Sequence, residues 1–180
     1  MRGINSIIPT HTVLEGGGFK VRRPVSMGRL MSPFLLLDEM GPANYGPGEA
    51  VGAPWHPHRG FETVTYMLHG EFEHEDSTGG KGKMKAGDVQ WMKTGSGIIH
   101  SEMPAMSDGK LQGFQLWINM PAKLKMSKPE YIYIDSKEMQ IHKDLDKTVK
   151  TIAGKFQKAE GPIKGHNLSL IHISEPTRPY

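Results

Sequence analysis

The chain has 180 residues, a net charge of +3 and no cysteine, which suits one domain with a normal core and leaves two domains cramped. The lysines of the second half are interleaved with acids, so we expect a solvated surface and no direct nucleic-acid binding. Disulfides are excluded, and no run approaches the roughly 18 apolar residues of a membrane span. The N-terminus carries no apolar signal segment, so a cytoplasmic protein without membrane contact is expected.

Short β-rich runs separated by glycine turns fill the chain before Pro121, and no helix of normal length is evident there. The expected strands are residues 34–37, 61–68, 71–75, 83–85, 89–92, 98–102 and 111–118. Many short strands with regular turns predict an all-β sandwich or barrel. Residues 122–165 are rich in lysine, with a strand expected at 130–134 and short helical turns near 136–139.

Two pairs of residues, His56-x-His58 and His100-x-Glu102, lie in sequence that reads as strand. Side chains at i and i+2 of a strand share one face, roughly 7 Å apart, so each pair can aim two ligands at one point. Together they supply three imidazoles and one carboxylate, a set suited to Fe(II), Mn(II), Ni(II), Cu(II) or Zn(II). A thiolate site is excluded because cysteine is absent.

A single His-x-His pair would favour ordinary structural histidines, but the context here favours a metal. Pro57 fixes the backbone between the first two histidines, and Gly60 permits a bulge that could re-aim them. The second pair follows a glycine-rich turn, and Ile98 shares its face. Two such pairs in one chain favour a metal site over structural histidines.

Other residues compete as ligands. Glu62 shares strand parity with His56 and His58 and could replace Glu102. His74 and Asp76 form a further pair, but their charged neighbours favour a strand that faces solvent. The remaining histidines lie in a loop or in no paired context: His69, His11, His142 and His166.

Four apolar residues are expected to form core or pocket wall. They are Val89, Trp91, Phe114 and Leu116. They alternate within expected strands and have no flanking basic stripe, so a stacking platform for nucleic acid is disfavoured.

The last thirteen residues, LSLIHISEPTRPY, do not continue the pattern of the domain. Their first eleven residues resemble the translation of a transposase adapter used in sequencing libraries. We therefore expect residues 168–180 to be a non-native tail that contributes nothing specific to the fold, and we exclude His172 and Glu175 from any site.

Longer motifs resemble the pirin family of the cupin superfamily: PFLLLDEM, HPHRGFETVTYMLHGEFEHEDSTG, AGDVQWMKTGSGIIHSEMP and LQGFQLWINMPAKLKMSKPEY. The resemblance covers residues 1 to about 166. It implies a cupin-type β-barrel (a double-stranded β-helix, or jelly roll) with one metal, usually iron, in the N-terminal of two barrels. The family's three-His, one-Glu ligand pattern falls on His56, His58, His100 and Glu102. Glu62 corresponds to a general cupin glutamate that pirins do without.

The resemblance also implies a longer protein than this chain. Residues 1–121 are expected to form the N-terminal metal-binding cupin domain. Residues 122–167 would be the linker and the start of a truncated second cupin. We expect the apolar residues Ile132, Ile134 and Ile152 to be partly exposed where the second barrel is missing.

The activity implied by the resemblance is that of quercetin 2,3-dioxygenase, which opens a flavonol ring with O₂ and releases carbon monoxide. The cofactor would be one divalent metal ion, Fe(II) before Mn, Ni, Cu, Co or Zn. Four protein ligands leave up to two positions on an octahedral metal, one for the flavonol 3-oxygen and one for O₂. Glu102 would serve as ligand and as catalytic proton acceptor.

Two alternatives stay open. Some pirins are redox-responsive regulators of transcription or of metabolic enzymes that act through protein partners, and a change in iron charge could bias a surface loop. The truncated chain could also be inactive. A deep, part-apolar cavity at the metal would favour the enzyme, and a shallow, charged mouth would favour the regulator.

Overall fold

The computed structural model describes residues 7–26, 31–145, 147–163 and 170–174. Two compact units divide the chain, Met1–Tyr133 and Ile134–Tyr180. The predicted all-β class is confirmed, because the helical elements named in the described residues are single 3-10 turns, η2 (Ala122–Leu124) and η3 (Ser136–Glu138). Within these residues, no helix has the length and apolar character needed to cross a membrane.

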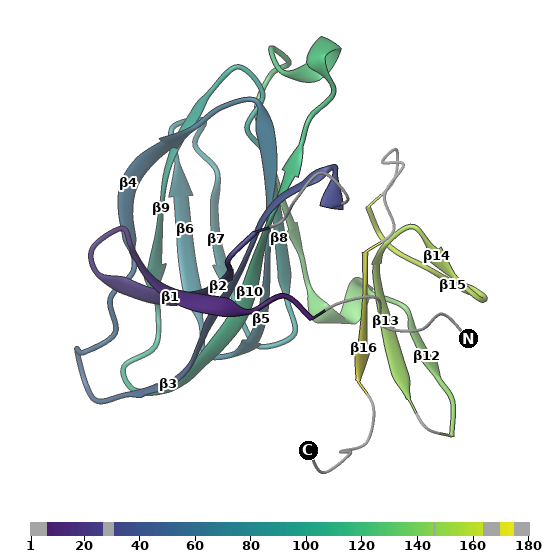
Figure 1. Cartoon of the computed structure of the whole chain (residues 1–180), viewed down its shortest axis with the longest axis horizontal. Coiled ribbons are helices and arrows are strands. Elements are labelled where there is room, and N and C mark those ends of the chain that lie inside the picture. The colour runs from purple at the N-terminus through teal and green to yellow at the C-terminus, as the bar shows by residue number, and fades with distance from the viewer. Residues whose placement is uncertain (1–6, 27–30, 146, 164–169, 175–180) are drawn as a thin grey trace. The chain divides into compact units, whose positions relative to one another are not determined.

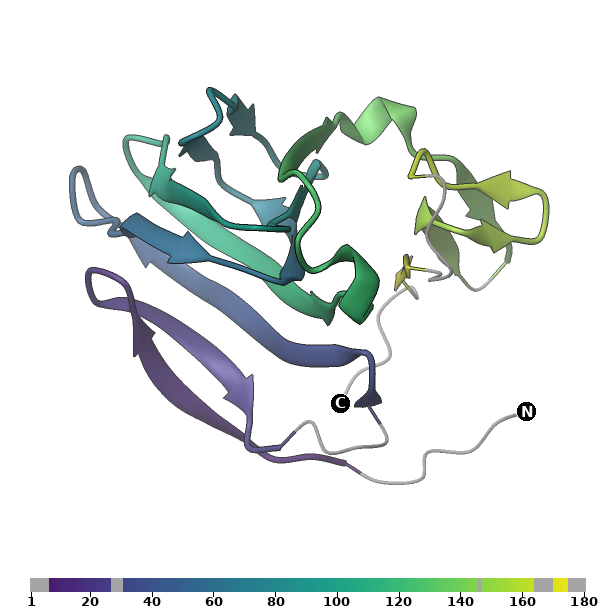
Figure 2. The ribbon, with the colours of Figure 1, turned by 90° about the horizontal axis from the view of Figure 1, so that it is seen from above.

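The first unit consists of two antiparallel sheets that face each other (Figures 1 and 2). The seven-stranded sheet has the order β1 (Thr10–Glu15), β2 (Phe19–Pro24), β3 (Phe34–Tyr45), β10 (Gly109–Asn119), β5 (Phe61–His69), β8 (Val89–Lys93) and β11 (Glu130–Ile134). The four-stranded sheet has the order β4 (Ala53–His58), β9 (Ile98–Pro104), β6 (Phe72–Asp76) and β7 (Lys81–Met84).

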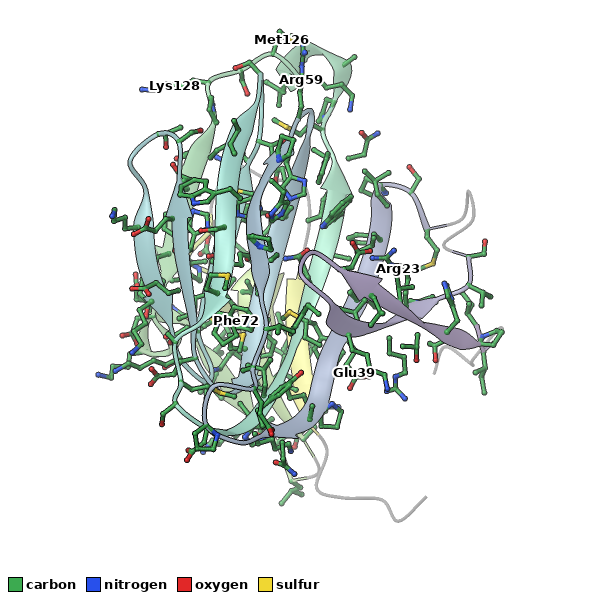
Figure 3. All side chains as sticks on the ribbon, turned by 90° about the vertical axis from the view of Figure 1, so that its left-hand side faces the viewer. Arg23, Glu39, Arg59, Phe72, Met126 and Lys128 are labelled. Atoms are coloured by element: carbon green, nitrogen blue, oxygen red, sulfur yellow. The ribbon has the colours of Figure 1, made fainter. Side chains whose placement is uncertain are left out.

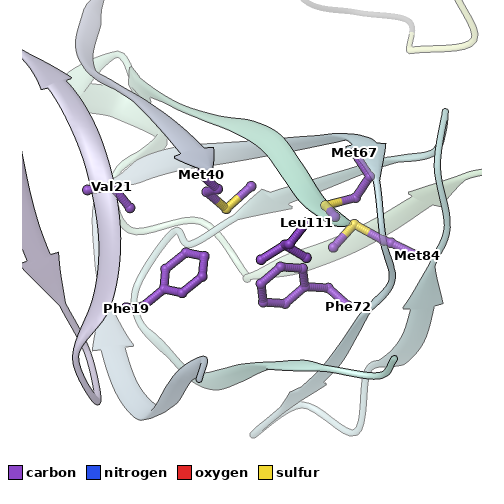
Figure 4. Packing of buried hydrophobic residues seen from close by; sticks show 7 residues of the cluster. All are labelled: Phe19, Val21, Met40, Met67, Phe72, Met84 and Leu111. Atoms are coloured by element: carbon purple, nitrogen blue, oxygen red, sulfur yellow. The ribbon is translucent and has the colours of Figure 1, made fainter. Parts of the chain in front are cut away.

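The core of this unit lies between the two sheets (Figure 4). Its buried cluster comprises Phe19, Val21, Met40, Met67, Phe72, Met84 and Leu111. Phe19 and Phe72 meet edge to face, with ring centroids 5.8 Å apart, and flexible methionines fill the irregular space around them. Of the predicted core residues, Val89 and Trp91 are fully buried, whereas Phe114 and Leu116 are half-buried.

The first unit extends beyond residue 121, where the resemblance placed the end of the domain. Strand β11 pairs beside β8 at the edge of the seven-stranded sheet. The Tyr133 hydroxyl donates to Asp88 Oδ2 at 2.7 Å, and Lys125 Nζ donates to the Gly60 carbonyl at 2.7 Å. These contacts tie residues 122–133 to the barrel, so the segment that follows η2 belongs to its sheet.

The second unit contains a three-stranded sheet of β12 (Ile141–Lys143), β13 (Thr148–Ala153) and β16 (Leu170–Ser174), with β13 in the centre. A hairpin of β14 (Lys155–Phe156) and β15 (Ala159–Glu160) follows β13. The expected exposure of Ile134 and Ile152 is wrong, since they are only 2% and 6% exposed. Ile132, in the first unit, is half-buried. Central β13 supplies buried residues from both of its faces, so this region has an apolar interior of its own.

Strand β16 lies within the segment expected to be a non-native tail. Its backbone pairs with β13 in the small sheet, with Val149 opposite Ile173, and it takes no place in the seven-stranded sheet. Residues 168–169 and 175–180 lie outside the described residues. Ladder hydrogen bonds use backbone groups that every non-proline residue carries, so this pairing is compatible with an adapter-derived sequence.

Candidate metal centre

Three histidines meet where β4 and β9 pair. His56 lies opposite His100 in the ladder, and the ligand nitrogens of His56, His58 and His100 all lie within 4.8 Å of one another. His100 is fully buried, while Ile99 beside it is 49% exposed. The i and i+2 geometry expected from the sequence therefore turns His100 toward the interior of the barrel.

Two of these imidazoles offer a ring nitrogen to a metal. His56 Nδ1 lies 2.7 Å from the Pro54 carbonyl, which can only accept, so Nδ1 carries the proton and Nε2 is bare. His100 Nε2 is buried and has no hydrogen-bond partner among the described residues. A buried polar atom without a partner is uncommon in proteins and fits a site built for an ion.

Electrostatics keep two of the imidazoles neutral. The pKa of His58 is lowered to about 4, chiefly by burial and then by the nearby His100 and His56, against an opposing effect of Glu102. The pKa of His100 is lowered to about 3 in the same way, chiefly by burial and then by His56 and His74, with Asp76 opposing them. Metal coordination needs the neutral imidazole, so both side chains are in the binding form at neutral pH.

Glu102 is held between the two sheets. Its Oε2 accepts from Gln115 Nε2 at 2.9 Å, and its Oε1 accepts from Thr65 Oγ1 at 3.3 Å and from Gln90 Nε2. Those donors stand on β10, β5 and β8 of the facing sheet, whereas Glu102 stands on β9. The carboxylate is therefore fixed inside the barrel by donors on both of its oxygens.

The predicted four-residue set is brought together in part. Among the described residues, one group of potential ligands contains His56, His58 and His100, and a second contains His74, His100 and Glu102. His100 is common to both groups. Glu102 thus lies within reach of His100, but not in the same tight group as His56 and His58.

His74 and Asp76 correct the sequence analysis, which expected them on a solvent-facing strand. Their exposed fractions are 0% and 6%. Along β6, Phe72, His74 and Asp76 point inward and alternate with Glu73 and Glu75. Phe72 is apolar and lies on the same strand face as His74 and Asp76, which indicates that this face is buried. The charged neighbours Glu73 and Glu75 lie on the opposite face.

Glu62, the alternative ligand, is engaged elsewhere. It is buried on β5 of the facing sheet, and its Oε2 accepts from the Trp91 indole Nε1 at 2.6 Å. Neither of the two ligand groups found among the described residues includes it. Its strand parity with His56 and His58 has no bearing here, because β4 and β5 lie in different sheets.

A cavity of about 220 Å³ opens onto His56, His58 and Glu102. Its wall is formed by Glu15, Gly16, Phe19, Val21, Arg23, Asp38, Met40, Ala53, His56, His58, Thr65, Phe72, Glu102, Gln115 and Trp117. Figure 3 labels Phe72, at the apolar side of this wall, and Arg23 on β2. Trp117 packs edge to face against His58, with ring centroids 5.2 Å apart.

An ion pair in the cavity wall was missed by the sequence analysis. Arg23 donates to Asp38 through Nε at 2.7 Å and Nη2 at 2.6 Å, and Nη2 also lies 2.6 Å from Glu15 Oε1. These residues come from β2, β3 and β1. No short motif joins them, so only the fold reveals the pairing.

Comparison with known proteins identifies the family of this barrel. The family model of pirin matches residues 18–118. The chain belongs to the pirin family. A crystal structure of quercetin 2,3-dioxygenase from Acinetobacter baumannii superimposes with a TM-score of 0.80 at 39% identity, covering 88% of this chain and 58% of that one. The cupin-type β-barrel expected from the sequence is thereby confirmed.

Curated pirin relatives are longer than this chain. A pirin-like protein of Caulobacter vibrioides is 41% identical over 178 residues, which cover 96% of this chain and 64% of that protein. A Vibrio cholerae protein, provisionally named quercetin 2,3-dioxygenase, is 41% identical over 166 residues, covering 91% and 58%. The chain thus spans roughly three fifths of the length of these relatives.

Proposed function

We propose that this pirin chain holds one divalent metal ion through His56, His58, His100 and Glu102, with Fe(II) before Mn, Ni, Cu, Co or Zn. The observation that carries the proposal is the cluster of three imidazoles within 4.8 Å of one another, in which His100 Nε2 is buried without a partner among the described residues. Three nitrogen donors and one carboxylate suit a redox-active first-row metal. Glu102 would supply the carboxylate, because one of its oxygens lies within 4.8 Å of a ring nitrogen of His100.

We further propose that this pirin chain uses the metal for dioxygenase chemistry on a flavonol-like aromatic substrate, with O₂ as the second reactant. Relatives with that name support this reaction class. The cavity supports it as well, because the apolar residues Phe19, Met40 and Phe72 line it together with His56 and His58. An apolar wall with a few polar groups is the usual character of a small-molecule site.

In this reaction the bound metal supplies Lewis acidity, which lowers the pKa of a coordinated hydroxyl, and iron adds redox capacity. The chain supplies the surroundings. Glu102 is placed to accept the substrate hydroxyl proton, and Gln115 and Thr65 hold its carboxylate in position. Trp117 and Phe61 stack with centroids 4.5 Å apart, and both pack edge to face against His58.

The cavity volume sets a condition on the substrate. About 220 Å³ is less than the roughly 300–1,000 Å³ of typical small-molecule sites. A flavonol therefore requires the wall to widen, whereas a single-ring phenol does not. A substrate panel should include quercetin, a flavonol without B-ring hydroxyls, and a catechol.

Metal binding is tested by loading the 180-residue protein with Fe(II) without oxygen, removing free metal and measuring bound iron. We expect close to one iron per chain. His58→Ala should lower the affinity at least about tenfold and leave the barrel folded, since its core does not depend on the metal. His69→Ala, an exposed histidine at the end of β5, is the matched control and should bind as the unchanged protein does.

Activity is tested separately, by oxygen uptake and carbon monoxide release with the iron-loaded protein. Quercetin turnover that is lost in His58→Ala and kept in His69→Ala supports the dioxygenase. Stoichiometric iron with no turnover of any member of the panel would refute the oxygenase proposal for this chain and leave the metal site standing.

A further inference from the structure

We propose that Asp76 and His74 are positioning residues that fix the tautomer of His100 and thereby present its Nε2 lone pair to the metal. This inference rests on the proposed metal centre and adds two residues to it. Neither is a metal ligand in this arrangement, and neither is among the residues that line the cavity.

The contacts form a line from the β6–β7 turn to the centre of the barrel. Asp76 Oδ2 lies 3.0 Å from His74 Nε2, and His74 Nδ1 lies 3.4 Å from His100 Nδ1. The side chains of His74 and Asp76 are 0% exposed, and His100 is fully buried. The line therefore runs entirely out of contact with water, where a misplaced proton is costly.

Asp76 defines which nitrogen of His74 carries the proton. Its other oxygen, Oδ1, accepts from the Thr78 amide at 2.7 Å, the Thr78 hydroxyl at 2.6 Å and the Gly80 amide at 3.1 Å. With these donors the side chain is a carboxylate, which can only accept. His74 Nε2 must therefore donate to Oδ2.

The tautomer of His74 in turn determines the tautomer of His100. A neutral His74 with its proton on Nε2 has a bare Nδ1, which can only accept. His100 Nδ1 must then donate to it, and a neutral His100 has its lone pair on Nε2. That nitrogen is the one with no partner among the described residues. In the opposite arrangement, His100 would bury an unpaired N–H and His74 would carry a buried positive charge.

Tyr131 fixes the plane of the central ring. It reaches His74 from β11 of the facing sheet and stacks on it with centroids 4.1 Å apart and an interplanar angle of 8°. His74 is thus held by Asp76 at one nitrogen, by His100 at the other and by a ring on its face. Because both nitrogens are engaged, His74 is less suited to be a ligand than its place in the second group of potential ligands suggests.

Asp76→Asn makes the proposal testable. The Asn oxygen must stay with the two backbone amides of Thr78 and Gly80, because those can only donate. Its NH₂ group then faces His74 Nε2, which must become the acceptor. The protons of both imidazoles shift to the other nitrogen, and His100 Nε2 becomes N–H. The matched control is Glu75→Gln, which removes the same charge from the outward face of the same strand.

Two readouts decide the matter. Long-range ¹H–¹⁵N spectra of the metal-free protein should show His100 protonated at Nδ1 in the unchanged chain and in Glu75→Gln, and at Nε2 in Asp76→Asn. Zn(II) affinity, measured by competition with a chromophoric chelator, should fall about 10–100-fold in Asp76→Asn and stay unchanged in Glu75→Gln.

Each outcome bears on a different claim. Protonation of His100 at Nε2 in the unchanged chain would overturn the proposed positioning of His100 by Asp76 and His74. This measurement does not need Asp76→Asn to fold. Equal Zn(II) affinity in the two variants would also overturn that positioning. Failure of the unchanged chain to bind Zn(II) and Fe(II) would refute the metal centre itself. The spectrum of the metal-free protein would still test whether Asp76 and His74 fix the tautomer of His100.

Discussion

Single residues of the site divide into those that strand parity reveals and those that only the fold reveals. The proposed ligands His56, His58, His100 and Glu102 were selected from the sequence, because i and i+2 spacing on a strand fixes a shared face. His74 could have been found by the same rule. Arg23 could not, since its partners stand on other strands and nothing in the sequence joins them.

At the residue scale we predict a pH dependence of stability in the metal-free protein. Burial lowers the pKa of His58 to about 4 from a usual value of 6.5. As the pH falls from 6.5 toward about 4, His58 becomes protonated in the unfolded chain but stays neutral in the folded chain. The free energy of unfolding therefore decreases. Above the usual value neither state is protonated, and this contribution to stability is present in full.

Urea unfolding of the metal-free protein at several pH values between about 4 and 7 measures this effect. Carboxylates also titrate at the acid end, so the comparison is with His58→Ala, which should show a shallower loss of stability on acidification. Identical slopes for the two proteins would contradict a neutral, half-buried His58. His69→Ala controls for removal of an exposed histidine.

At the element scale, the strands and their turns follow from local sequence, but their order in the sheets does not. β9 lies between β4 and β6, so His100 has His56 on one side and Asp76 on the other. Those neighbours are far apart in the chain, and their register is fixed by burial of whole faces. The sequence therefore predicted the His100–Glu102 pair and left its cross-strand partners unknown.

The close approach of β7 to β11 gives a prediction at this scale. A Cβ added at Gly82 would lie 2.2 Å from the Tyr131 hydroxyl oxygen and 3.1 Å from Cζ. Gly82→Ala should push Tyr131 off His74 and cost about 1–3 kcal/mol of stability, as overpacking usually does. Gly17→Ala, whose Cβ would meet nothing nearer than the Gly52 carbonyl oxygen at 3.4 Å, should cost less. Equal urea midpoints for the two variants would show that Tyr131 is not held there.

At the scale of the whole chain, the predicted β-barrel is right, and the first compact unit reaches Tyr133. Local sequence identified a strand at 130–134 but not its partner, because pairing of β11 with β8 joins segments far apart in the sequence. The small sheet of the second unit could not be foreseen from its lysine-rich sequence. Its buried residues, such as Val149 and Ala153, are spaced among charged ones.

Deletion of residues 168–180 tests how the two units depend on the end of the chain. Removal of β16 leaves β13 with one ladder partner, β12, so amides of β13 should exchange with solvent faster. The proposed metal ligands and the core cluster all lie in the unit Met1–Tyr133. Fe(II) affinity and the exchange protection of β5, β9 and β10 should therefore be unchanged. Hydrogen exchange followed by mass spectrometry measures both regions in one experiment.

Weaker Fe(II) binding or lost protection in β9 would show that the barrel needs this segment. Unchanged exchange in β13 would show that β16 adds nothing to its sheet.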